Sequence, residues 1–100
     1  MSEYDEDNYR FEPEAKNDLE DSFLWYEKQK EGLGRDFAIE VFDKAREISK
    51  VSRDKKDSSV QKAYLKRFPF SLYYVFKEKW ISIIAVWHNK RNPETLKKRK

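Results

Sequence analysis

The spacing of apolar residues changes between the two halves of the chain, and this change constrains the fold more than any other feature of the sequence. In the first half, apolar residues recur every three or four positions, in the series Ala15, Leu19, Phe23, Tyr26 and the series Phe37, Val41, Ala45, Ile48. That spacing places the members of each series on one face of a helix. We therefore predict two amphipathic helices, from Glu14 to near Lys30 and from about Asp36 to Lys50.

The two glycines of the chain, Gly32 and Gly34, lie between the predicted helices. Glycine adopts the left-handed backbone conformation without a steric penalty, so it can end one helix while the chain turns into the next. The sequence therefore predicts a helical hairpin. The segment Ser52 to Ser59 contains no apolar residue and predicts an exposed loop after the second helix.

After this loop the apolar period changes to two. β-Branched and aromatic residues dominate three segments, Gln61 to Phe68, Phe70 to Phe76 and Trp80 to His88, and the spacer Lys77 to Lys79 is short enough for a hairpin. A short strand is also expected over Asn8 to Glu12, because the residue before a proline favours an extended backbone. The order strand, two helices, three strands predicts an α+β domain of two layers, in which a mostly antiparallel sheet carries the helical hairpin on one face and leaves the other face open.

The predicted single domain spans residues 1–100, with a flexible acidic N-terminus over residues 1–7 and a flexible basic tail over residues 97–100. No stretch approaches the roughly 18 to 20 apolar residues that span a bilayer, and the N-terminus is acidic where a signal peptide is basic. We expect a soluble cytoplasmic protein that does not contact a membrane. The sequence has no cysteine and one histidine, which excludes a disulfide and a thiolate metal site, and we predict no metal and no cofactor.

Charge is divided unevenly along the chain. Residues 1–36 hold 5 Lys or Arg against 12 Asp or Glu, whereas residues 37–100 hold 17 against 7. A basic region of this kind attracts nucleic acid or an acidic protein over long range. Scattered lysines are as often only a solvated surface, so the clustering of the cations decides between the two interpretations.

The predicted hairpin gathers cations at one end of the sheet. With a three-residue loop, Phe76 lies opposite Trp80, and counting back along both strands places Phe68 opposite His88. The cations that this register brings together are Lys66, Arg67, His88, Lys90 and Arg91. An RNA phosphate or an acidic peptide suits such a place, because arginine binds oxyanions through two hydrogen bonds and lysine acts as a point charge.

Aromatic residues near this cluster have two interpretations. Tyr73 and Tyr74 point to opposite faces of the sheet, so one of them joins the core while the other packs on the surface or stacks on a base or a partner side chain. Trp87 lies beside the cations and has the same two interpretations. Trp25 and Trp80 are assigned to packing.

Three segments together resemble the RelE/ParE superfamily of bacterial type II toxins, specifically its ParE-like and plasmid-stabilisation members. They are DLEDSFLWYEKQKEGLGRDF, YLKRFPFSLYYVF and IIAVWHNKRNP, and the resemblance covers roughly Asn8 to Leu96. It implies a compact toxin that inhibits growth, encoded beside an antitoxin whose extended or helical segment wraps the toxin in a hetero-oligomer. We expect that segment to cover the helical hairpin or the open sheet face.

One activity of that superfamily is RelE-like cleavage of mRNA on the ribosome without a metal, which needs a proton acceptor, a cation for the phosphorane and a proton donor. The catalytic candidates for such an endoribonuclease are Lys66, Arg67, His88 and Arg91. The chain departs from the nuclease pattern at two positions. Ser71 stands where those nucleases usually carry an arginine, and Thr95 is the nearest match to their C-terminal tyrosine.

The other activity is ParE-like poisoning of DNA gyrase, a binding event that needs no catalytic residue. The spacing of His88, Arg91 and Pro93 is similar to the C-terminal motif of ParE-like chains. The candidate residues for binding gyrase or nucleic acid are Lys66, Arg67, Tyr73, Trp87, His88, Lys90 and Arg91. The two departures favour the gyrase poison, with the ribosome-dependent RNase as the alternative. For His88 and Arg91, capping of nearby backbone groups is the plain structural interpretation.

Overall fold

The computed structural model describes residues 8–50 and 59–99. The predicted flexible N-terminus and nearly all of the predicted loop from Ser52 to Ser59 lie outside these residues. The elements follow in the order β1 (Tyr9–Phe11), α1 (Pro13–Gln29), α2 (Leu33–Ser49), β2 (Gln61–Tyr64), β3 (Phe70–Phe76), β4 (Ile81–His88) and the 3-10 helix η2 (Pro93–Arg99). Within the described ranges, no helix has the length and apolar character needed to cross a membrane.

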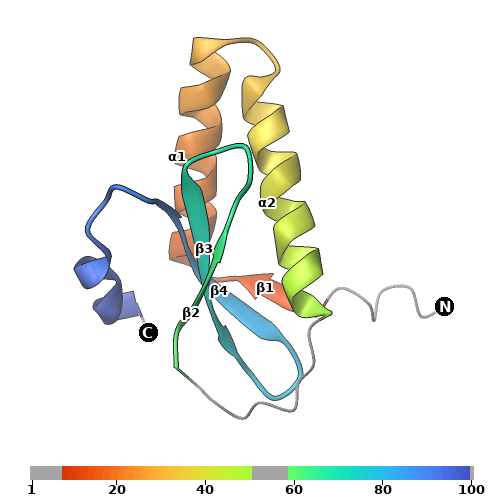
Figure 1. Ribbon diagram of the computed structural model, residues 1–100, viewed down its shortest axis with the longest axis vertical. Helices are drawn as coiled ribbons and strands as arrows, with labels where there is room; N and C mark the ends of the chain where they lie inside the picture. The colour runs from red at the N-terminus through yellow and green to blue at the C-terminus, as the bar shows by residue number, and fades with distance from the viewer. Residues whose placement is uncertain (1–7, 51–58, 100) are drawn as a thin grey trace, which may run out of the picture.

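The four strands form one sheet in the order β1-β4-β3-β2. β4 pairs in parallel with β1 and antiparallel with β3, and β3 pairs antiparallel with β2. The two helices run side by side as a hairpin, and η2 lies away from them beside the sheet (Figure 1). The structure therefore confirms the predicted α+β fold with the helical hairpin on one face of a mostly antiparallel sheet.

The glycine turn between the helices is confirmed. Gly32 has φ 89°, and α2 begins directly after it at Leu33, three residues before the predicted start. Glu27 explains the early start, because its carboxylate accepts hydrogen bonds from the backbone N–H groups of Gly32 and Gly34 at 2.9 and 3.0 Å. Those N–H groups have no partner within the helix, so a side chain of α1 caps α2.

The predicted register of the β3–β4 hairpin is wrong. Phe76 lies opposite Ile81 instead of Trp80, and a bulge on β4 leaves Ile84 without a partner residue on β3. Beyond the bulge the observed pairing differs from the predicted pairing by two residues, so Phe70 and not Phe68 lies opposite His88. A bulge inserts one unpaired residue without interrupting the apolar run, and a count of alternating residues therefore does not detect it.

Apolar side chains pack on both faces of the sheet. Under the helices the core includes Phe37, Val41, Phe70, Leu72, Ile81 and Ile83, and on the far face a second cluster comprises Val75, Ile84, Ala85, Trp87 and Leu96. Leu96 belongs to η2, so the C-terminal segment covers part of the face that we expected to be open. Within the predicted basic tail, the guanidinium of Arg99 is largely buried against Asp18.

Candidate functional site

The basic turn, which we define as residues 88–91, follows directly from β4. The N–H of Asn89 donates to the carbonyl of Pro69 at 2.8 Å, and the N–H of Arg91 donates to the carbonyl of His88 at 3.0 Å. The N–H of Lys90 donates to Nδ1 of His88 at 3.0 Å. Nδ1 is therefore an acceptor, and a neutral His88 carries its proton on Nε2. These bonds fix the turn while the side chains of Lys90 and Arg91 remain exposed.

Trp87 positions one of these cations. The guanidinium carbon of Arg91 lies 3.7 Å from the centroid of the Trp87 ring, and that of Arg99 lies 5.0 Å away. Such stacking is favourable, because the face of an indole ring carries negative potential. Trp87 is 2% exposed, so its ring has no room to stack on a base. It acts instead as the support on which Arg91 rests.

Lys66 and Arg67 lie in the β2–β3 connection and are held by α2. Their backbone N–H groups both donate to the carboxylate of Glu40. The guanidinium of Arg67 lies 3.7 Å from the carboxylate of Asp36, and its carbon lies 5.4 Å from the centroid of the Phe68 ring. The structure thus brings His88, Lys90 and Arg91 together and places Lys66 and Arg67 against α2.

Tyr73 belongs to a different cluster, on the face of the sheet away from the helices. Tyr74 packs in the core under the helices, so the two tyrosines point to opposite faces as predicted. The ammonium group of Lys62 lies 4.6 Å from the ring centroid of Tyr64 and 5.5 Å from that of Tyr73. Hydrogen bonding to Tyr64, and then to Tyr73, raises the pKa of Lys62. Sequence reasoning missed Lys62 and Tyr64, although the alternation of β2 places them on one face.

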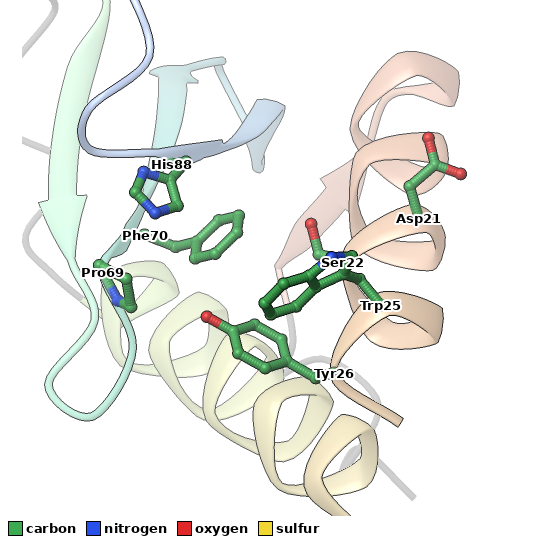
Figure 2. Close-up of a pocket in the computed structure, with 7 residues that line it drawn as sticks. All are labelled: Asp21, Ser22, Trp25, Tyr26, Pro69, Phe70 and His88. Atoms are coloured by element: carbon green, nitrogen blue, oxygen red, sulfur yellow. The ribbon is translucent and has the colours of Figure 1, made fainter. Parts of the chain in front are cut away.

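An apolar hollow of about 540 Å³ lies beside the basic turn, between α1 and the adjoining ends of β3 and β4. In Figure 2, Trp25, Tyr26 and Ser22 of α1 stand on one side, across from Pro69, Phe70 and His88. The rings of Trp25 and Tyr26 meet edge to face at 5.1 Å, as do those of Phe70 and His88 at 5.0 Å. We call this hollow the Trp25 groove.

Trp25 is 58% exposed, so its assignment to packing is wrong. The sequence does indicate this exposure. Tyr26 belongs to the apolar series of α1, and successive residues of a helix are rotated by about 100°, so Trp25 points away from the apolar face. Burial raises the pKa of Tyr26, the neighbour that does face inward. Asp21 adds a carboxylate to the lining of the groove on the α1 side.

Asp18 and Arg99 fix the strand that leads into the basic turn. β1 pairs with β4 only as far as Ile83, which leaves the next edge groups of β4 without a backbone partner. The carboxylate of Asp18 accepts from the N–H of Val86 at 3.1 Å, and Arg99 donates to the carbonyl of Ile84 at 3.0 Å. Asp18 and Arg99 also bind each other through two hydrogen bonds, of 2.6 and 3.1 Å. The hydrogen bond to Asp18 is the main reason that the pKa of Arg99 is raised.

Comparison with known proteins gives this fold a counterpart. No protein-family model matches the chain, and no curated protein sequence matches it significantly. Among solved structures, a chain of the "Chromosomal ParDE TA system from P. aeruginosa" superposes with a TM-score of 0.69. The two are 18% identical, and the match covers 84% of this chain and 97% of the other. This protein therefore has the fold of a chain found in a chromosomal ParDE system.

Proposed function

We propose that this protein is the toxin of a type II toxin–antitoxin system, that it inhibits bacterial growth by binding DNA gyrase in the cytoplasm, and that an antitoxin neutralises it. The observation that carries the proposal is the fold shared with a ParDE chain over 97% of that chain's length. The exposed cations Lys90 and Arg91, on a turn fixed by hydrogen bonds, supply a contact for the enzyme or its DNA.

The surroundings of Ser71 and Thr95 support binding over RNA cleavage. Ser71 is 0% exposed, and its hydroxyl donates to Oδ1 of Asn89 at 2.6 Å. A buried serine cannot present a positive charge to a phosphorane, which is the role of the arginine that it replaces. The hydroxyl of Thr95 lies 3.4 Å from the carbonyl of Asn92, its acceptor within the C-terminal segment. The carboxylate of Asp36 lies 3.7 Å from the guanidinium of Arg67 and offsets part of the charge of this catalytic candidate.

A ribosome-dependent endoribonuclease is the second candidate, and one observation favours it. Lys62, Tyr64 and Tyr73 form a cation–aromatic cluster on the sheet face opposite the helices. Single-stranded RNA binds to surfaces of this composition, because bases stack on aromatic rings while cations contact phosphates. This cluster shares no residue with the basic turn, so substitutions distinguish the two candidates.

Induced expression in a bacterial host tests the proposal, with DNA damage and protein synthesis followed separately. We expect a DNA-damage response while translation is still intact, and loss of growth arrest on Arg91→Ala. Lys79→Ala is the matched control, because Lys79 is an exposed cation in the loop at the other end of the β3–β4 hairpin. Cleaved transcripts with early arrest of translation, abolished by Lys62→Ala, would establish the RNase instead. Normal growth without the antitoxin would contradict both candidates.

A further inference from the structure

His88 holds the backbone of both cations in the basic turn. Its Nδ1 accepts a hydrogen bond from the N–H of Lys90 at 3.0 Å, and its carbonyl accepts one from the N–H of Arg91 at 3.0 Å. The imidazole ring is itself supported, because it meets the buried ring of Phe70 edge to face at 5.0 Å. Of the two hydrogen bonds, only the one to Lys90 depends on which side chain stands at position 88.

The bond to Lys90 requires a neutral imidazole. A neutral imidazole has one nitrogen that accepts, whereas a protonated imidazole carries a hydrogen on both nitrogens. A protonated Nδ1 would face the N–H of Lys90 donor against donor, so the two groups would separate. Histidine is the side chain that ordinarily gains its proton between about pH 5 and 8. The titratable groups beside this ring are Lys90 and Arg91 in the turn, and Asp21 and Tyr26, which line the same hollow from α1.

The chain makes an equivalent bond with an asparagine four residues later. Oδ1 of Asn92 accepts from the N–H of Glu94 at 2.9 Å, which is again a side-chain acceptor two residues before the donor. Asparagine holds turns in this way because its short side chain reaches the backbone two residues on. Its amide does not titrate near neutral pH, so the bond at Asn92 is insensitive to pH. His88 makes the same kind of bond through an acceptor that a proton removes.

We infer that His88 is a positioning residue for the proposed target contact: its neutral Nδ1 orders Lys90 and Arg91, and protonation of its imidazole releases the turn and weakens the contact. The inference rests on the proposed function and adds its regulation by pH. It gives His88 neither a direct contact with the target nor a proton-transfer step.

The first measurement needs no target, and it is unambiguous because the chain has a single histidine. In nitrogen-15 NMR spectra of the full chain at about pH 8, the proton of the neutral imidazole should be on Nε2. Lowering the pH to about 5.5 should reduce the protection of the Lys90 amide against hydrogen exchange at least threefold, with the midpoint of the imidazole signals. The Asn89 amide is the internal control, because it donates to the carbonyl of Pro69 and should keep its protection. A proton on Nδ1 at about pH 8, or a Lys90 amide that does not follow the titration, would overturn the inference.

Two substitutions at position 88 separate the acceptor from the ring. His88→Asn keeps an acceptor two residues before Lys90 and loses the ring on Phe70, whereas His88→Phe keeps a ring and loses the acceptor. The readout is inhibition of supercoiling by purified DNA gyrase, with circular dichroism to check that both variants fold. The unsubstituted chain should inhibit at least threefold more weakly at about pH 6 than at about pH 8, since one lost hydrogen bond corresponds to about a fivefold change. His88→Asn should inhibit equally at both pH values, and His88→Phe about fivefold more weakly at both.

Each other result overturns a defined statement. Stronger inhibition at the lower pH would show that the added charge on His88 acts, and not the lost acceptor. An active His88→Phe with a weak His88→Asn would make His88 only a packing partner of Phe70. Loss of inhibition in both folded variants would mean that the imidazole contacts the target or transfers a proton.

The two measurements also separate this inference from the proposed function. If the unsubstituted chain and both variants inhibit gyrase with the same pH profile, the inference is wrong and the proposed function stands. If the Lys90 amide follows the titration of His88 as expected but the chain does not inhibit gyrase at any pH, the proposed function fails and the pH-dependent turn remains.

Discussion

The two halves of β4 differ in which groups form hydrogen bonds with the strand edge that faces away from β3. Residues 81–83 lie between β1 and β3, so backbone groups pair on both sides. Residues 85–88 pair with β3 alone, and side chains bind the other edge from the bulge residue onward: Asp18 accepts from the N–H of Val86, and Arg99 donates to the carbonyl of Ile84. Both halves are buried, yet one is held by a neighbouring strand and the other by two charged residues.

This difference explains where the candidate site lies. A strand that is paired on both sides has no free edge, whereas the second half of β4 has an edge that the side chains of Asp18 and Arg99 contact, and a hollow opens at its end between His88 and α1. The Trp25 groove lies at the end of this half, and the basic turn continues from it. The arrangement also makes the site dependent on Asp18 and Arg99, which are 81 positions apart in the sequence.

The largest expected effect comes from removing side-chain volume in the half that is paired on both sides. Ile83 is 0% exposed in the core under the helices, and Ile83→Ala should lower the free energy of unfolding by about 3–4 kcal/mol, through lost burial and the cavity left behind. Ile84→Ala should cost about 2 kcal/mol, because η2 can move toward the space that it leaves. Urea unfolding measures both values. Equal costs would mean that η2 is as rigid a cover as the two helices.

Removing the side-chain contacts at the edge of the second half of β4 should have the next largest effect. Asp18→Ala leaves Arg99 and the N–H of Val86 without their acceptor in a largely buried place, and we expect a loss of about 2–3 kcal/mol. Glu14→Ala is the control. Its carboxylate lies 3.6 Å from Arg99 but is 63% exposed, so the cost should stay below about 0.5 kcal/mol. The double variant Asp18→Ala, Arg99→Met should lose less stability than the sum of the losses in the two single variants. If the two losses simply add, Asp18 and Arg99 are not directly coupled.

The sequence predicts the parts of the fold that local rules determine. Apolar spacing places both helices to within about one turn and gives β3 its observed bounds, Phe70–Phe76. Gly32 predicts the turn, because only a left-handed residue fits there. The capping by Glu27 is not predicted, since it depends on how the two helices pack, and the start of α2 is therefore misplaced by three residues.

The candidate site is less predictable, because it depends on contacts between distant residues. The bulge at Ile84 moves the register by a further residue and brings Phe70, not Phe68, opposite His88. β2 ends at Tyr64 and not at Phe68 as predicted, so Lys66 and Arg67 lie in the connection before β3, where Glu40 of α2 binds their backbone. His88, Lys90 and Arg91 are neighbours in the sequence, so their clustering can be predicted without knowing any contact between distant residues.

Two buried serines give a smaller and more local test of the same comparison. Ser82, in the first half of β4, donates to the carboxylate of Glu12, and Ser71 on β3 donates to Asn89 of the basic turn. Ser82→Ala should cost about 1.5 kcal/mol and Ser71→Ala about 1 kcal/mol, because a hydrogen bond to a charged acceptor is the stronger one. Hydrogen exchange should add a distinction: only Ser71→Ala should speed exchange of the Asn89 N–H. Faster exchange there in Ser82→Ala would show that the two halves are not independent.

The smallest effect at neutral pH is expected at Tyr26, which lines the groove. Burial raises its pKa above the ordinary value of 10.0, so the folded state favours the protonated phenol. Its contribution to stability is therefore fully present below pH 10 and is lost as the pH rises through the folded pKa. Tyr26→Phe should change stability by no more than about 0.5 kcal/mol at pH 7, and above pH 10 it should lose less stability than the unsubstituted chain.

Tyr74, opposite Ile83, has its pKa raised by burial as well, so Tyr74→Phe gives the same measurement at the half of β4 that is paired on both sides. An equal loss of stability above pH 10 in Tyr26→Phe and in the unsubstituted chain would contradict the raised pKa of Tyr26.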